Sequence, residues 1–175
     1  MVDAVRAGAP AGLEWFNAAP ADQAGPVVAS CCASGEWLRA LLTDRPYPSL
    51  PALLVASDRI LLDLDWDQVE RALAAHPRIG EPARGLGAVE TGWSAREQAR
   101  VRSGPDLDRE LIAGNLAYER RFGHVFLIRA AGRSSAQILA ALTERLANDP
   151  ATERTRVRRE LAEITRGRLE RVLSP

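Results

Sequence analysis

The chain contains no lysine, because all 23 of its Lys-plus-Arg residues are arginines. Schiff-base catalysis and pyridoxal phosphate chemistry both need a lysine amine, so the sequence excludes both. A phosphate-binding P-loop, which requires Gly-Lys-Ser/Thr, is excluded for the same reason. Any catalysis by this chain must therefore use other side chains.

Cysteine, aromatic residues and net charge are also scarce. The two cysteines are adjacent, Cys31 and Cys32, and neighbouring cysteines rarely close a disulfide in good geometry. Buried packing in a reduced, cytoplasmic setting is the favoured interpretation. Aromatics make up 5% of the chain and the formal net charge is +0, which disfavours nucleic-acid and anionic-membrane partners.

Membrane and metal signals are missing too. No apolar run reaches the ~18 residues of a membrane span, and the N-terminus lacks a signal-peptide core. The two histidines, His76 and His124, have no cysteine cluster or carboxylate spacing that would make a metal site. At 175 residues and 46% hydrophobic, we expect a loose segment over 1–10 and a single domain over 11–175.

Apolar residues recur at the helical period through most of the chain. The expected helices span about 13–17, 22–34, 37–44, 50–64, 65–75, a stretch beginning at 94, 106–122, 134–148 and 150–173. Gly35 is expected to end the second helix, and Ser49, Asp65 and Ser134 to cap later ones. Val125–Ile128 instead predicts a short, extended, buried segment. The predicted fold is all-α, a helical bundle with a long functional loop after a central His-Pro.

That His-Pro pair is His76-Pro77. His76 falls on the apolar face of the preceding helix by the 3.6-residue period, and Pro77 stops the helix. A glycine-rich loop over 78–93 follows, and such long loops are usually functional or disordered. Two interpretations of the imidazole are open, a core histidine bonded to a carbonyl and a proton-transfer group.

Arg168 lies in the middle of the apolar stripe of the last helix. A guanidinium facing the core must meet an anion or several carbonyls, because an unpaired buried charge costs several kcal/mol. The partner is either an internal carboxylate or a substrate carboxylate. The acidic residues of this helix, by contrast, are expected on a solvated mixed-charge face: Glu153, Glu160, Glu163 and Glu170.

Two further polar residues need partners. Asn115 interrupts the apolar stripe of the 106–122 helix, where a structural hydrogen bond is the commoner explanation and a substrate contact the alternative. Glu97 completes a capping-box pattern with Ser94, so its local pattern favours a plain capping carboxylate. Arg133, beside the Gly132 turn, could join a site or cap neighbouring carbonyls.

An ordered set of motifs resembles one family, the 2-oxo-4-hydroxy-4-carboxy-5-ureidoimidazoline (OHCU) decarboxylases of urate breakdown. The set comprises Phe16-Asn17, Cys31-Cys32-Ala33-Ser34 with Trp37, Arg45-Pro46-Tyr47, His76-Pro77-Arg78-Ile79-Gly80, Trp93-Ser94-Ala95-Arg96-Glu97-Gln98, Asn115-Leu116-Ala117-Tyr118, Arg121-Phe122-Gly123, Phe126, Gly132-Arg133-Ser134 and Ile164 with Arg168-Leu169. The chain departs from the family at Arg129, where a small or apolar residue, often Cys, is expected.

The resemblance implies an all-helical fold, usually a homodimer, without a cofactor, acting on a small ureidoimidazoline acid. It implies stereospecific loss of CO₂ to give (S)-allantoin. The family's essential histidine, glutamate and arginine match His76, Glu97 and Arg168. Its substrate contacts match these residues: Pro77, Ser94, Ala95, Arg96, Glu97, Gln98, Phe126, Leu127, Ile128, Arg129 and Ala130.

The chemistry is compatible with a cofactor-free site, because the substrate ring can accept the electrons that CO₂ leaves behind. We expect Glu97 to pair with His76 and fix its tautomer, Arg168 to clamp the substrate's polar edge, and backbone N–H groups of 126–130 to hold ring oxygens. Two alternatives remain, another lyase or hydrolase acting on a small ureide, and a helical adaptor that binds a protein partner.

Overall fold

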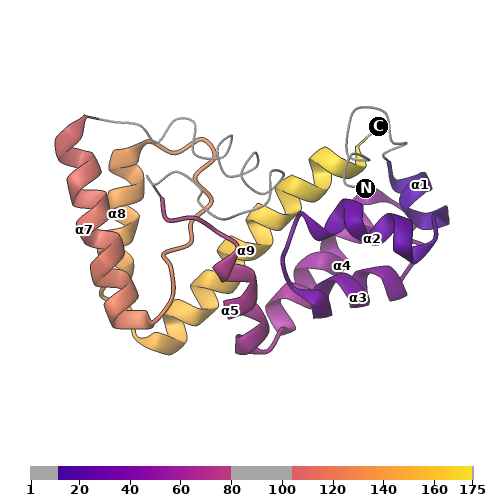
Figure 1. Cartoon of the computed structure of the whole chain (residues 1–175), viewed down its shortest axis with the longest axis horizontal. Helices are drawn as coiled ribbons and strands as arrows, with labels where there is room; N and C mark the ends of the chain where they lie inside the picture. Colours follow the sequence, from indigo (N-terminus) through magenta and orange to yellow (C-terminus); the bar gives the residue numbers. More distant parts are fainter. Residues whose placement is uncertain (1–11, 80–103, 175) are drawn as a thin grey trace.

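The computed structural model describes residues 12–79 and 104–174. These residues form eight α-helices, labelled as in Figure 1: α1 (Leu13–Ala18), α2 (Ala21–Ala29), α3 (Gly35–Thr43), α4 (Leu50–Asp63), α5 (Trp66–Ala74), α7 (Pro105–Phe122), α8 (Ser135–Arg145) and α9 (Pro150–Leu173). No β-strand occurs among the described residues, which confirms the all-α prediction. The expected loose segment over 1–10 lies outside them.

The helices gather at the two ends of the long helix α9 (Figure 1). α7 and α8 pair near its N-terminal end, and α1 to α4 surround its C-terminal half. α4 packs against α9 along much of its length, and α5 lies between the two groups. Within residues 12–79 and 104–174, no helix combines the length and apolar character that crossing a membrane needs.

Two apolar clusters form the core. The larger joins α1 to α5 with α9 and includes Trp37, Leu53 and Leu161, each fully buried. The smaller joins α7 and α8 and includes Leu111 and Ile138. The chain between α7 and α8 runs between the clusters, so its side chains contribute to both.

Local capping explains most helix starts. Ser49 accepts a hydrogen bond from the Ala52 amide at 3.3 Å, Asp149 accepts bonds from the first turn of α9, and Ser134 forms the predicted capping box with Gln137. Asp65 precedes α5 as predicted, but its side chain makes no capping bond.

The expected end of the second helix at Gly35 is wrong. α2 ends at Ala29, and Gly35 instead begins α3. The reason is Ser34, whose hydroxyl oxygen accepts a hydrogen bond from the Trp37 amide at 3.2 Å and so caps α3.

The expectation of a solvated acidic face on α9 is also wrong for two residues. Glu153 and Glu160 are 0% and 2% exposed, whereas Glu163 and Glu170 are exposed as expected. The helical period accounts for this, because Glu153 lies four residues before the buried Val157 and Glu160 three after it.

We expect Gly114→Ala to destabilise the fold by about 1–2 kcal/mol. A Cβ at Gly114 would lie 2.5 Å from Cδ2 of the buried Leu142, and the overpacking cost of about 1–3 kcal/mol exceeds the gain in helix propensity. Urea unfolding measures the change. Gly167→Ala in α9 is the control, because its Cβ meets nothing within 4 Å and should raise stability by about 0.5–1 kcal/mol.

Candidate active site

His76 lies just beyond the C-terminal end of α5, with its amide bonded to the Leu73 carbonyl at 2.9 Å. The side chain is 9% exposed, and Nδ1 lies 2.9 Å from the carbonyl oxygen of Ala72. A carbonyl only accepts hydrogen bonds, so Nδ1 carries the proton and Nε2 holds the lone pair of the neutral ring. The backbone of α5 therefore fixes the tautomer of His76.

The segment after His76 is held against α7 at two points. Asn115 donates a hydrogen bond from Nδ2 to the Ile79 carbonyl at 3.0 Å, which is the structural bond that the sequence favoured. Glu119, one turn later, accepts two bonds from the Arg78 guanidinium at 2.6 and 2.7 Å. The hydrogen bond from Arg78 lowers the pKa of Glu119, so this pair is ionised at neutral pH.

We expect Asn115→Leu to lower stability by about 1–3 kcal/mol, because it leaves the buried Ile79 carbonyl without its donor. Release of the segment that follows His76 should also lower kcat/KM about tenfold to hundredfold. Thermal unfolding and steady-state kinetics measure the two effects. Leu116→Asn is the matched control, since Leu116 is 42% exposed and its replacement should change stability by no more than about 0.5 kcal/mol.

Arg168 points into the core, as the helical period predicted, and is 3% exposed. Its Nη1 donates a long hydrogen bond to the Cys31 carbonyl at 3.4 Å. Cys32 is also buried, and burial raises the pKa of its thiol to about 11 although Ser34, Thr165 and Arg168 oppose the shift. Both cysteines are buried and outside any disulfide, as the packing interpretation predicted, and the Cys31 carbonyl contacts Arg168.

The sequence predicted a short, extended, buried segment over Val125–Ile128, and in the structure residues 125–130 belong to no helix or strand. Phe126, Leu127 and Ile128 are buried as predicted, whereas Val125 is half-buried. The side chains of the Phe126–Ala130 segment alternate between the clusters: Phe126, Ile128 and Ala130 join the smaller, and Leu127 joins the larger. Arg129 is exposed, and its amide donates to Oε2 of Glu160 at 2.8 Å.

The amides of Ile128 and Ala130 form no hydrogen bond with any described residue, although both residues are nearly buried, at 2% and 4% exposed. Buried amides are normally paired. These two N–H groups therefore can receive the oxygens of a small molecule.

Three described segments that carry candidate residues lie close together: the chain after α5, the Phe126–Ala130 segment and α9 (Figure 1). Ile79, three residues after His76, belongs to the same apolar cluster as Ile128 and Ala130. On the other side, residues 129–131 and the α9 turn around Gly167 line a small hollow of about 30 Å³. The extended segment thus connects the chain beyond His76 with the helix that carries Arg168.

Several predicted site residues lie outside the described residues: Ser94, Ala95, Arg96, Glu97 and Gln98. The same is true of the 80–93 part of the expected loop. Arg133, whose role was open, donates from Nε to the Arg129 carbonyl at 3.1 Å, so it caps a carbonyl of the extended segment. Among the described residues, no group of three metal-ligating side chains occurs.

Sequence reasoning missed a buried network beside the extended segment. Arg145, 3% exposed, pairs with Glu153 and donates to the Leu127 carbonyl at 2.7 Å. Burial would raise the pKa of Glu153, but hydrogen bonds from Arg145, Tyr118 and Asn148 outweigh burial and lower it. The signal was the helical spacing of Glu153 from Val157, which places the carboxylate on the buried face of α9.

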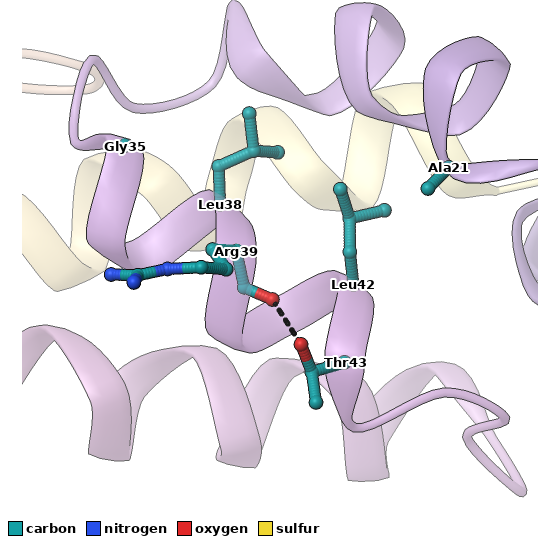
Figure 2. A pocket seen from close by; sticks show the side chains of 6 residues that line it. All are labelled: Ala21, Gly35, Leu38, Arg39, Leu42 and Thr43. Atoms are coloured by element: carbon teal, nitrogen blue, oxygen red, sulfur yellow. Dashed lines mark hydrogen bonds between the residues drawn. The ribbon is translucent and has the colours of Figure 1, made fainter.

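A separate hollow of about 340 Å³ lies over α2 and α3 (Figure 2). Leu38 and Leu42 supply its apolar lining, with Arg39 and Thr43 beside them. None of its lining residues is a predicted site residue. The converging segments around His76 and Arg168, and not this hollow, therefore make the candidate site.

Comparisons with known proteins identify the family of the chain. Residues 17–170 match the family model described as OHCU decarboxylase. The chain is 31% identical over 147 residues to the uric acid degradation bifunctional protein TTL of Arabidopsis thaliana, covering 82% of this chain and 45% of that protein. The chain thus spans less than half the length of this curated relative.

Two solved structures are similar to this one. A crystal structure of OHCU decarboxylase in the presence of (S)-allantoin has a TM-score of 0.71 and 26% identity, covering 84% of this chain and 96% of that chain. A crystal structure of (S)-allantoin synthase also has a TM-score of 0.71, at 18% identity, covering 93% of this chain and 54% of that chain. The second likeness shows the fold alone.

Proposed function

The chain belongs to the OHCU decarboxylase family, a family of carboxy-lyases, and we propose that it converts 2-oxo-4-hydroxy-4-carboxy-5-ureidoimidazoline to (S)-allantoin and CO₂ in urate breakdown. The observation that carries the proposal is the family match over residues 17–170. Its geometric support is a buried imidazole of fixed tautomer, a buried guanidinium and two amides, those of Ile128 and Ala130, that no other described residue binds.

The reaction needs orientation and proton transfer more than a cofactor. When the bond from the ring carbon to the carboxylate breaks, its electron pair moves into the conjugated ring, and CO₂ leaves. A proton then returns to one face of the ring, which sets the configuration of the product. The protein must therefore hold the acid, stabilise the negative charge on the ring and control one proton.

His76 is the proposed proton-transfer group. Since the Ala72 carbonyl holds Nδ1–H, the lone pair on Nε2 is the site that can take a proton from the substrate and return it. Because this carbonyl holds Nδ1, Nε2 is the ring atom at which the expected pairing with Glu97 would occur. Glu97 is therefore proposed to act at Nε2 or on the substrate itself.

Arg168 and the extended segment are the proposed binding groups. The guanidinium offers a fork of N–H donors that suits a planar carboxylate or ureide edge, and burial strengthens these bonds. The amides of Ile128 and Ala130 supply donors for ring oxygens, in the manner of an oxyanion hole. Pro77, Phe126 and Leu127 are proposed to shape the walls.

We further propose, from the family resemblance, that the 94–98 stretch, which carries Glu97, supplies the remaining substrate contacts. We also propose that the chain acts as a homodimer in the cytoplasm, as the family resemblance implies. Sedimentation equilibrium tests the oligomeric state, and a monomer at micromolar concentration contradicts the dimer.

A kinetic assay tests the proposed activity. The substrate is generated from urate by oxidation and hydration immediately before use, and circular dichroism follows the formation of optically active allantoin. Decarboxylation by this chain should accelerate CO₂ release and yield an excess of the (S) enantiomer. A rate equal to the spontaneous one favours the adaptor alternative, and consumption of substrate without CO₂ favours a hydrolase.

A further inference from the structure

The Phe126–Ala130 segment belongs to no helix or sheet, so its backbone must be positioned by side chains from elsewhere. Four of its backbone groups are bonded to groups outside the segment. Arg133 binds the carbonyls of Arg129 and Ala130, while more distant parts of the chain bind the Leu127 carbonyl and the Arg129 amide. In an extended chain the amide and carbonyl of one residue point to the same edge, and residues two apart share that edge. Residues 127 and 129 therefore present their backbone groups to one edge, and Ile128 and Ala130 present theirs to the other.

The first anchor is Arg145, at the C-terminal end of α8. Its Nη1 holds the Leu127 carbonyl at 2.7 Å, and its guanidinium lies over the Phe126 ring, 4.6 Å from the ring centroid. Glu153 fixes the guanidinium with bonds of 2.8 Å from Nε and 2.5 Å from Nη2. The carboxylate is in turn bonded by Tyr118 and by Asn148 at 2.7 Å, so every part of this anchor is held.

The second anchor is Glu160, which lies seven residues after Glu153 on α9. Its Oε2 accepts the Arg129 amide at 2.8 Å, and its Oε1 accepts Nη2 of Arg156 at 3.0 Å. The carboxylate is 2% exposed, which makes the charge-assisted bond to the amide strong. Arg156 lies on the outer side of this contact, with its side chain 45% exposed.

We propose that Glu160 and the Arg145–Glu153 pair are positioning groups that fix the register of the Phe126–Ala130 segment against α9. By occupying the edge of residues 127 and 129, they direct the amides of Ile128 and Ala130 to the opposite edge, where substrate oxygens bind. Glu160 and Glu153 stand on the same helix as Arg168, so one rigid element sets both the backbone donors and the guanidinium. This inference rests on the proposed decarboxylase function.

Kinetics of three variants test Glu160. Glu160→Ala removes the acceptor of the Arg129 amide and should lower kcat/KM about tenfold to hundredfold, the scale for misplaced donors. Glu160→Gln keeps an oxygen that can accept the amide, so it should stay within about threefold of wild type. Arg156→Ala removes the outer ion pair but leaves the bond to the amide, so it should behave as wild type. A folded Glu160→Ala variant with the wild-type kcat/KM overturns the proposal.

An NMR titration of the wild-type protein with (S)-allantoin tests the same register if Glu160→Ala fails to fold. The amide resonances of Ile128 and Ala130 should shift most, while that of Arg129 should shift little because Glu160 holds it. Large shifts at Arg129 with none at Ile128 or Ala130 overturn the proposal. A wild-type chain that neither accelerates decarboxylation nor binds allantoin overturns the proposed function itself, and the positioning proposal with it.

Discussion

Replacing His76 with asparagine should lower kcat by about 10²–10⁴-fold while the fold persists. The amide nitrogen of asparagine can take the place of Nδ1 and keep the hydrogen bond to the Ala72 carbonyl, now 2.9 Å long. The variant lacks any counterpart of Nε2, which is the atom proposed to move the proton. The change therefore separates the structural role of the ring from its proposed chemical role.

Steady-state kinetics and far-UV circular dichroism measure the two roles of His76 separately. His124→Asn is the matched control, because His124 is buried among Trp66, Tyr118 and Phe122 and is not a proposed site residue. This control should keep kcat within about threefold of wild type wherever it remains folded. A His76→Asn variant with near-normal production of (S)-allantoin would remove His76 from the mechanism and leave it a core histidine.

Local sequence patterns predicted the helices because their determinants are local. The N-caps Ser49, Ser134 and Asp149 bond to amides within three residues of their own position. The local sequence is therefore enough to predict where these helices start. The wrong prediction for the end of α2 also has a local cause. The glycine pattern favours a helix end at Gly35, whereas the Ser34 hydroxyl caps the start of α3.

The helical period of α9 predicts the burial of Arg168, and it also predicts the burial of Glu153 and Glu160. Charge alternation suggested a solvated face, although both carboxylates fall on the buried stripe by spacing. Their partners, the Arg145 guanidinium and the Arg129 amide, come from segments that the sequence does not place beside α9. A pattern on one helix predicts that a carboxylate is buried, but the partner is a property of the tertiary fold.

The candidate site also combines features that local patterns predict with contacts that depend on the tertiary fold. Helical period and the proline rule placed His76 at an inward-facing helix end, and its tautomer depends on the Ala72 carbonyl, four residues earlier in the last turn of α5. The bond from Asn115 to the Ile79 carbonyl, by contrast, spans 36 residues of sequence, and the period of α7 indicated only that Asn115 needed a partner.

Replacing Arg168 with lysine should lower kcat/KM about 10–150-fold, with much of the change in KM. Lysine keeps the positive charge but offers a point charge in place of the planar fork. Loss of one charge-assisted hydrogen bond of about 1.5–3 kcal/mol gives this range, at about 1.4 kcal/mol for each factor of ten. The guanidinium is 3% exposed, and burial strengthens the charge-assisted bonds that it would make to a substrate acid.

Arg159→Lys on the same helix is the control for Arg168→Lys, because Arg159 is exposed and should tolerate lysine with unchanged kinetics. Substrate-dependence curves for both variants, together with the affinity for (S)-allantoin from isothermal titration, distinguish binding from chemistry. An Arg168→Lys variant that keeps both KM and allantoin affinity would assign a structural role to the buried guanidinium, through its bond to the Cys31 carbonyl. The substrate acid would then have to be held by other donors, of which the Ile128 and Ala130 amides are the nearest described candidates along the extended segment.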